Sequence, residues 1–137
     1  MRIIVAGLGV QGEKRRAIAG KEVVATVDPV HSKADYKSLI DVPLDSYDAA
    51  LVCTPDDAKI DLLMHLLDNR KHLLVEKPLL AADTSVLETL AELARSKGVV
   101  CYTAYNHRFE PHFIRMKQVI ESRDLGKVYC ARLFYGN

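Results

Sequence analysis

Five short apolar runs alternate with stretches of helical periodicity between residues 3 and 103 of this 137-residue chain. The runs are mostly continuous rather than alternating with polar residues, which is typical of strands that are covered on both faces. A chain that alternates such strands with helices forms a parallel sheet with crossover helices. The pattern therefore predicts an α/β fold with a doubly wound parallel sheet. The predicted strands are residues 3–6, 23–28, 49–53, 72–76 and 99–103.

The segments between these runs carry the apolar spacing of helices that pack on a sheet. The clearest apolar stripe falls at positions i, i+3, i+4 and i+7, which places its members on one helix face. These members are Ile60, Leu63, Met64 and Leu67. Further helices are predicted over residues 12–19, 83–97 and 111–122, and Gly98 suits the end of the second of these.

Composition excludes several classes of function. The 19 Lys and Arg against 18 Asp and Glu leave a formal charge of +1, which provides no field to hold nucleic acid. The basic run at residues 14–16 is too short for that purpose and is interpreted as a solvated helix face. No apolar stretch approaches the roughly 20 residues of a membrane span. The three cysteines lie far apart and the histidines lack metal-ligand spacing, so we expect a reduced, cytoplasmic protein without a metal site.

A glycine-rich turn directly follows the first predicted strand. Gly7-Leu8-Gly9-Val10-Gln11-Gly12 fits the pattern G-x-G-x-x-G and opens a helical segment. In this setting Gly7 permits a tight turn, Gly9 lets backbone N–H groups approach a pyrophosphate, and Gly12 allows close helix–strand packing. The phosphates then lie at a helix N-terminus. The motif predicts a dinucleotide site, although a glycine-rich turn that binds no dinucleotide is the alternative.

Asp28 ends the second predicted strand, about 20 residues after Gly7, where a dinucleotide-binding fold places an acidic residue. Its carboxylate would accept hydrogen bonds from the adenosine ribose hydroxyls and repel the 2′-phosphate of NADP. We therefore expect NAD rather than NADP. His31 and Lys33, which follow in the loop, are the residues that could reach a phosphate instead.

Two more strand ends carry polar residues. An open parallel sheet binds its ligand beyond the carboxyl ends of its strands, so Thr54-Pro55 would face the cofactor. A helix N-cap role for Thr54 or Asp56 is the alternative, and it is compatible with that contact. Glu76-Lys77-Pro78 sets a carboxylate and an ammonium at the same edge. An ammonium beside a hydroxyl that is being oxidised stabilises the developing alkoxide. The alternative is a surface Lys77 paired with Glu76.

Taken together, these motifs resemble the Gfo/Idh/MocA family of oxidoreductases (glucose–fructose oxidoreductase, inositol dehydrogenase and rhizopine catabolism). The family carries Glu-Lys-Pro after this strand, and residues 105–109, Tyr-Asn-His-Arg-Phe, are similar to its Tyr-Asn-x-Arg-Phe segment. The resemblance implies a Rossmann-type domain that binds NAD or NADP through residues 7–12, Asp28, Thr54 and Pro55.

The resemblance also implies an activity and roles for further residues. Lys77 would be the catalytic lysine that hydrogen-bonds the reacting substrate oxygen, and the Lys77–Pro78 bond is often cis in the family. Glu76 and Asn106 would line the cofactor, with Arg108 close by. The substrate would be a small carbohydrate-like molecule: a sugar, a polyol or a sugar-derived acid. A stand-alone NAD-binding regulatory module without catalysis is the alternative.

The chain departs from the family in length. We expect residues 1–124 to form the Rossmann domain and residues 125–137 to begin a substrate domain that is otherwise absent, with a strand over residues 127–135. The chain would then be a fragment that binds cofactor without turning over substrate. An apolar strand with open edges pairs with another copy, folds back on its own domain or aggregates. We expect a homo-oligomer through this strand. A smaller departure is Asp56, Asp57 and Lys59, where many relatives carry Asn and a later His.

Overall fold

A five-stranded parallel sheet organises the N-terminal part of the chain, which we describe from a computed structural model covering residues 1–55 and 58–134. The strand order is β2-β1-β3-β4-β5, and every neighbouring pair is parallel. The strands are β1 (Ile3–Ala6), β2 (Val23–Val27), β3 (Ala49–Val52), β4 (His72–Val75) and β5 (Cys101–Thr103). The predicted α/β fold and its five strands are confirmed. Because β1 has β2 on one side and β3 on the other, the order reverses at its carboxyl end, where such sheets bind ligands.

The strands end one residue earlier than predicted at three of the carboxyl ends. Asp28, Cys53 and Glu76 each follow the last residue of a strand instead of closing it. They still continue the ladder at its margin, since the backbone N–H groups of Cys53 and Glu76 donate to the carbonyls of Ala6 and Val52. Their side chains therefore stand at the edge of the sheet.

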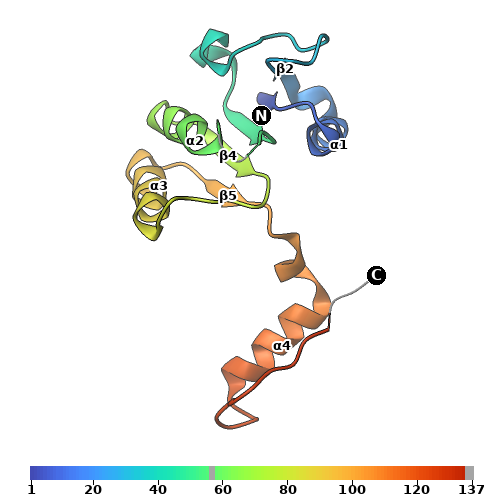
Figure 1. Cartoon of the computed structure of the whole chain (residues 1–137), viewed down its shortest axis with the longest axis vertical. Coiled ribbons are helices and arrows are strands. Elements are labelled where there is room, and N and C mark those ends of the chain that lie inside the picture. Colours follow the sequence, from blue (N-terminus) through green and yellow to red (C-terminus); the bar gives the residue numbers. More distant parts are fainter. Residues whose placement is uncertain (56–57, 135–137) are drawn as a thin grey trace. The chain divides into compact units, whose positions relative to one another are not determined.

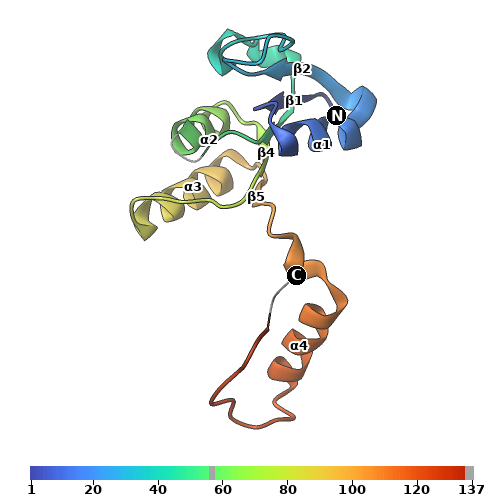
Figure 2. The ribbon, with the colours of Figure 1, turned by 45° about the vertical axis from the view of Figure 1, so that its right-hand side comes forward.

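Helices cover both faces of the sheet, with α1 on one side and α2 and α3 on the other (Figures 1 and 2). Their bounds are α1 (Val10–Ala19), α2 (Lys59–Asp68) and α3 (Thr84–Lys97). Asp83 caps α3 by accepting a hydrogen bond from the backbone N–H of Ser85, and Gly98 ends the helix in the left-handed region at φ 69°. Helix α1 begins at Val10 rather than at the predicted Gly12, because Gly12 packs inside its first turn.

The connection from β2 to β3 contains short 3-10 turns, η2 (Leu39–Asp41) and η3 (Leu44–Ser46), in place of an α-helix. Tyr36 lies against the end of β2 through a bridge to Val27. Leu39 of this connection is buried in the core.

The core lies between the sheet and α2 and α3. Its fully buried members on the strands and helices are Ile4, Val52, Val75, Leu63, Leu66 and Leu67. The predicted α2 stripe is confirmed for Leu63 and Leu67, whereas Ile60 and Met64 are half-buried at its margin. Leu66 lies outside that stripe and is buried because α3 packs on the other side of α2.

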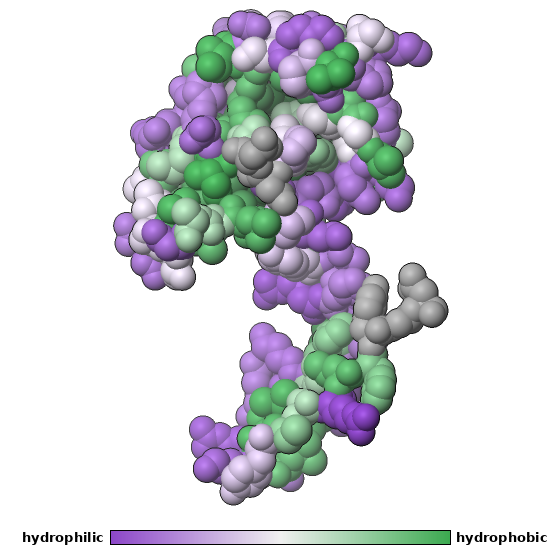
Figure 3. All heavy atoms as spheres, viewed as in Figure 1, coloured by the Kyte–Doolittle hydropathy of each residue, from purple (hydrophilic) through white to green (hydrophobic). Residues whose placement is uncertain are grey.

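The chain divides into two compact units, Met1–Ala104 and Tyr105–Asn137, each of which we describe by itself. The second unit contains the 3-10 turn η5 (Asn106–Phe109) and the predicted helix, α4 (Pro111–Ser122). None of its described residues is buried, and apolar residues share its surface with polar ones (Figure 3). None of the helices described in either unit is long and apolar enough to cross a membrane.

The predicted strand over residues 127–135 is wrong for residues 127–134, which lie in no strand, and Tyr135 is outside the described residues. A strand forms only when a neighbour satisfies its backbone N–H and C=O groups, and no strand pairs with these residues in the structure described. That residues 125–137 begin a second domain stays a prediction.

Candidate functional site

The glycine turn between β1 and α1 can be built only from glycine at two of its three positions. Gly7 has φ +89°, and a Cβ on it would lie 2.7 Å from the Cys53 carbonyl oxygen. A Cβ on Gly12 would lie 1.8 Å from the Gly7 carbonyl oxygen. Both distances are far below van der Waals contact, so these residues let β1, β3 and α1 approach one another.

Gly9 differs from the other two glycines because it faces open space. No heavy atom lies within 4 Å of a Cβ built on it. Gly9 is the N-cap of α1 and provides no side-chain cap, so the first N–H groups of α1 have no partner from that residue. Val10 and Gln11, which follow, are exposed. The open N-terminus of a ten-residue helix is suited to an anion.

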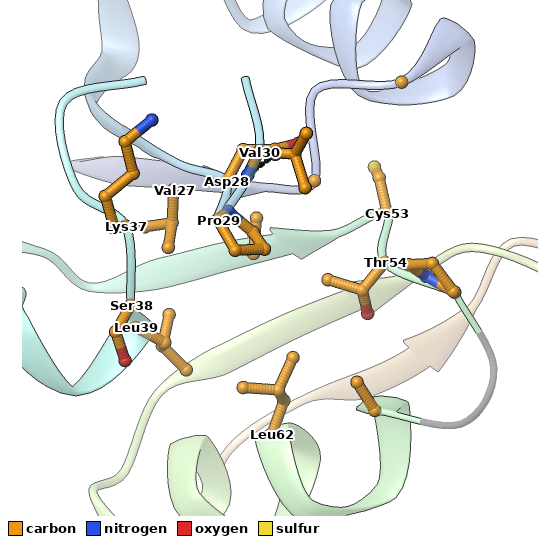
Figure 4. Close-up of a pocket in the computed structure, with 15 residues that line it drawn as sticks. Val27, Asp28, Pro29, Val30, Lys37, Ser38, Leu39, Cys53, Thr54 and Leu62 are labelled. Carbon is orange, nitrogen blue, oxygen red and sulfur yellow. Dashed lines mark hydrogen bonds between the residues drawn. The ribbon is translucent and has the colours of Figure 1, made fainter. Parts of the chain in front are cut away.

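A cavity of about 770 Å³ lies beside this turn, at the carboxyl edge of β1, β2 and β3. We call it the strand-end pocket. It is bordered by Gly7 and Gly9, by Asp28 and Pro29 after β2, by Thr54 after β3, and by residues of the β2–β3 connection and α2 (Figure 4). Apolar side chains make up much of its wall; they are Ala6, Val27, Pro29, Val30, Leu39, Pro55, Ala58 and Leu62. An apolar cleft with a few polar groups is typical of a cofactor site.

Asp28 is held in one orientation by three backbone N–H groups. Leu8 donates to Oδ2 at 2.8 Å, while Val30 and His31 donate to Oδ1 at 2.9 and 2.8 Å. These bonds, from Leu8 first and His31 next, hold the pKa of Asp28 below its ordinary value. A carboxylate has about four acceptor positions. The ionised Asp28 therefore keeps acceptor capacity for a ligand hydroxyl.

Thr54 brings a hydroxyl without a protein partner to the pocket. Its Oγ1 is buried and has no hydrogen bond to any residue that the structure describes. The alternative N-cap role is wrong for α2, because that helix begins at Lys59 with Ala58 as its N-cap. A buried hydroxyl ordinarily finds a partner, so this oxygen is positioned for a ligand.

Glu76 and Lys77 lie at the end of β4 in contrasting environments. The Glu76 carboxylate is 8% exposed and pairs with Arg15 of α1, whose Nε and Nη2 lie 2.6 and 2.5 Å from Oε1. The predicted solvated face is therefore wrong for Arg15. Glu76 has Arg15 as its partner, whereas the sequence alternative paired it with Lys77. Lys77 is exposed, and the Lys77–Pro78 peptide bond is cis.

The remaining predicted residues, Asn106 and Arg108, lie in η5 of the second unit. Of the predicted residues, the strand-end pocket is lined by Gly7, Gly9, Asp28, Thr54 and Pro55. Leu8 bonds Asp28 through its backbone N–H, whereas Val10, Gln11 and Gly12 do not line the pocket. The first unit sets Glu76 and Lys77 at the same sheet edge, at the end of the neighbouring β4. That Asn106 and Arg108 join this site stays a prediction.

Three site features escaped the sequence interpretation. Arg15 pairs with Glu76, Lys59 donates to two carbonyls beside Lys77, and Lys37 of the β2–β3 connection lines the pocket. The Arg15 pair joins residues 61 positions apart, and helical spacing carries no signal for such a contact. In the part of the chain that the structure describes, no three His, Cys, Asp or Glu side chains gather as metal ligands.

Comparison with known sequences identifies the family. Residues 1–105 match the oxidoreductase family with an NAD-binding Rossmann fold that is named Gfo/Idh/MocA. The chain belongs to this family, which confirms the resemblance drawn from the motifs. The class defined by fold and site is thus that of the NAD-binding oxidoreductases.

Particular relatives share only part of their length with this chain. The myo-inositol 2-dehydrogenase of Thermotoga maritima is 28% identical over 99 residues, which cover 72% of this chain and 29% of the relative. The scyllo-inositol 2-dehydrogenase (NAD(+)) of Bacillus subtilis is 26% identical over 148 aligned positions, covering 93% and 42%. The chain therefore spans less than half the length of these two relatives.

Solved structures share the fold. A probable dehydrogenase from Thermotoga maritima superposes with a TM-score of 0.71 at 25% identity, covering 93% of this chain and 42% of that one. The UDP-N-acetylglucosamine 3-dehydrogenase of Acidithiobacillus ferrooxidans gives 0.74 at 21% identity, covering 87% and 43%.

The residues of the first unit fit a dinucleotide of the kind that the family binds. Gly9 leaves room at the helix N-terminus, where a Cβ would stand in the approach to the backbone. The unpartnered Thr54 hydroxyl and the oriented Asp28 carboxylate supply polar contacts on two other sides of the pocket. Such a ligand requires N–H donors for its phosphates, an acceptor for its hydroxyl groups and an apolar wall.

Proposed function

We propose that this chain is the cofactor-binding part of an NAD-dependent oxidoreductase that acts on a hydroxyl group of a polyol, a sugar or a sugar-derived acid. The observation that carries the proposal is the strand-end pocket. It sets an oriented, ionised Asp28 beside an open helix N-terminus at the point where the strand order reverses. The inositol dehydrogenases among the relatives support the substrate class.

The proposed cofactor contacts follow the residues of the glycine turn. Backbone N–H groups at Gly9, Val10 and Gln11 would receive the pyrophosphate at the start of α1. Leu8 already donates its N–H to Asp28, so its role is to orient that carboxylate. Asp28 would accept from the adenosine ribose and repel a 2′-phosphate, which favours NAD over NADP.

The proposed chemistry belongs to the end of β4. Oxidation of a secondary alcohol removes a hydride from carbon, which NAD would accept, and a proton from oxygen, which would pass to solvent water. Lys77 would donate a hydrogen bond to the reacting oxygen and stabilise the negative charge that develops there. Glu76 would keep its buried position through Arg15, and Asn106 and Arg108 would complete the cofactor site.

We also propose that residues 127–135 pair with a second copy.

Calorimetric titration of the chain with NAD and NADP tests the cofactor site. We expect NAD to bind more tightly than NADP, and Gly9→Ala to weaken NAD binding by about tenfold or more, because the added Cβ stands in the approach to the backbone. The melting temperature of Gly9→Ala should stay close to that of the wild type, since the Cβ meets no protein atom. Asp28→Ala should reduce the ratio of NAD affinity to NADP affinity.

The cofactor proposal is wrong if neither dinucleotide binds at millimolar concentration. Tighter binding of NADP by the wild type would overturn the NAD assignment alone.

Steady-state kinetics of Lys77→Ala in the native gene product, with myo-inositol as the first probe, tests the catalytic role. We expect kcat to fall by about a hundredfold or more, with NAD affinity unchanged. Lys97→Ala, at the end of α3, is the control because it removes a lysine ammonium from the same unit, one that pairs with Asp68. Unchanged turnover in Lys77→Ala would favour the regulatory module over the enzyme.

A further inference from the structure

The ammonium of Lys59 lies where little solvent reaches it. It begins α2, and only 2% of its surface is exposed. A lysine is almost never buried to this degree unless its ammonium is bound. The first turn of a helix is also an unfavourable place for a cation, because the helix dipole is positive there. Burial at this position therefore needs a specific reason.

Two backbone carbonyls that accept hydrogen bonds from this ammonium lie on either side of a single residue. Nζ of Lys59 donates to the carbonyl oxygen of Glu76 at 3.0 Å and to that of Pro78 at 2.7 Å. The residue between these two carbonyls is Lys77. One buried group thus holds the backbone on both sides of the exposed lysine at the end of β4.

The backbone at this point has few other means of support. Glu76 makes the last ladder bond of β4, through its N–H to the Val52 carbonyl. Pro78 has no N–H to donate, and residues 77–82 form no helix or strand. Beyond the last ladder bond of β4, the Lys59 ammonium therefore donates to backbone carbonyls as the N–H groups of a neighbouring strand would within the sheet.

A second cation fixes the same segment from the opposite helix layer. Arg15 of α1 holds the Glu76 side chain, while Lys59 of α2 holds the Glu76 carbonyl. The backbone beside Lys77 is therefore anchored from both faces of the sheet, and the Lys77 side chain is exposed to solvent. Such anchoring limits where the Lys77 ammonium can move.

We propose that Lys59 is a positioning residue for Lys77: its buried ammonium fixes the carbonyls of Glu76 and Pro78 and so sets the direction of the Lys77 side chain. This role rests on the proposed function, because it assigns Lys59 to the catalysis that Lys77 would perform. The proposed pyrophosphate and ribose contacts follow β1 and β2, away from the end of β4. Loss of the Lys59 ammonium should therefore affect turnover more than cofactor affinity.

Lys71 offers a matched control within the same unit. Its Nζ also donates to two backbone carbonyls, those of Leu44 at 2.5 Å and Tyr47 at 2.8 Å. Lys71 immediately precedes β4, so its bonds lie at the amino end of the strand that ends beside Lys77. Lys59→Met and Lys71→Met thus remove the same chemical group from the two ends of one strand.

The experiment compares the two variants by NMR on the chain and by kinetics on the native gene product. We expect Lys59→Met to shift or broaden the amide signals of Lys77 and Leu79, and Lys71→Met to leave them unchanged. With myo-inositol as the probe, kcat of Lys59→Met should fall at least tenfold while the dissociation constant of NAD stays within about threefold of the wild type. Lys59→Arg, which keeps charged donors, should recover part of kcat.

The outcomes separate the two proposals. Unchanged Lys77 and Leu79 signals in Lys59→Met overturn the positioning role, whatever the wild type binds. An equal loss of kcat in Lys71→Met also overturns it, because the effect would then be one of stability. If Lys59→Met does not fold, Lys59→Gln, which keeps two neutral donors, is compared in its place by the same criteria. A wild type that binds no NAD overturns the proposed function, and with it the expected effect of Lys59 on turnover, whereas the NMR comparison still tests the positioning of Lys77.

Discussion

The two units of this chain contain helices of similar length whose apolar side chains are buried to very different degrees. Helix α2 in the first unit buries Leu63, Leu66 and Leu67 completely, whereas α4 in the second unit, two residues longer, buries none of its side chains. Both helices are amphipathic, and Ile114, Met116 and Ile120 of α4 remain 37–50% exposed. An amphipathic helix gains most of its stability from what its apolar face packs against. The difference between the units is therefore the sheet, which supplies that surface to α2.

Gly12→Ala should produce the largest change and confine it to the first unit. The new Cβ would lie 1.8 Å from the Gly7 carbonyl, so the turn and α1 must separate. We expect a loss of about 3 kcal/mol or more in the free energy of unfolding, measured by denaturant titration of the first unit's circular dichroism. Amide signals of α4 should stay in place. Movement of those signals would show that the two units are coupled.

A matched pair of truncations compares the two helices directly. Leu67→Ala removes a fully buried side chain from α2, and we expect it to cost about 2–5 kcal/mol. Ile120→Ala removes a side chain that is 50% exposed in α4, and we expect an effect within about 0.5 kcal/mol. Equal losses in the two variants, measured by thermal and denaturant unfolding, would contradict the contrast between the helices.

The smallest expected effect concerns acid stability at the start of the sheet. The Arg2 guanidinium and its backbone N–H bond Asp48 at 2.6 and 2.8 Å and hold the pKa of that carboxyl at about 2, below its ordinary 3.8. Because the folded pKa is the lower one, the stabilisation is complete above the ordinary value and is lost as the pH falls toward 2. The melting temperature of Asp48→Asn should be lower than that of the wild type at pH 6, and the two should approach each other near pH 2. A constant difference across this range would contradict the ion pair.

Local patterns were sufficient for much of the first unit. Strands, the α2 stripe and the end of α3 at Gly98 depend on residues within a few positions of one another, so periodicity and the glycine predicted them. The glycine turn was also predictable, since its spacing reflects backbone requirements that no other residue meets at Gly7 and Gly12. Asp28 followed from its distance to that turn.

The predictions that failed depended on partners distant in sequence or on neighbours that only packing provides. Residues 14–16 carry the composition of a solvated helix face, yet Arg15 finds a carboxylate 61 positions away. Residues 127–134 have the alternation of a strand, but alternation specifies only which face is apolar. Without a neighbouring strand to accept their backbone hydrogen bonds, these residues do not form one.

The sequence by itself thus determined the parallel sheet, the glycine turn between β1 and α1 and the family to which the chain belongs. The tertiary structure decided the partners of the charged groups: three N–H groups around Asp28, Arg15 on Glu76, and Lys59 on the carbonyls beside Lys77. The physical reason is range. Periodicity and turn chemistry act over a few residues, whereas a buried charge is satisfied by whichever groups the completed fold brings within hydrogen-bond distance.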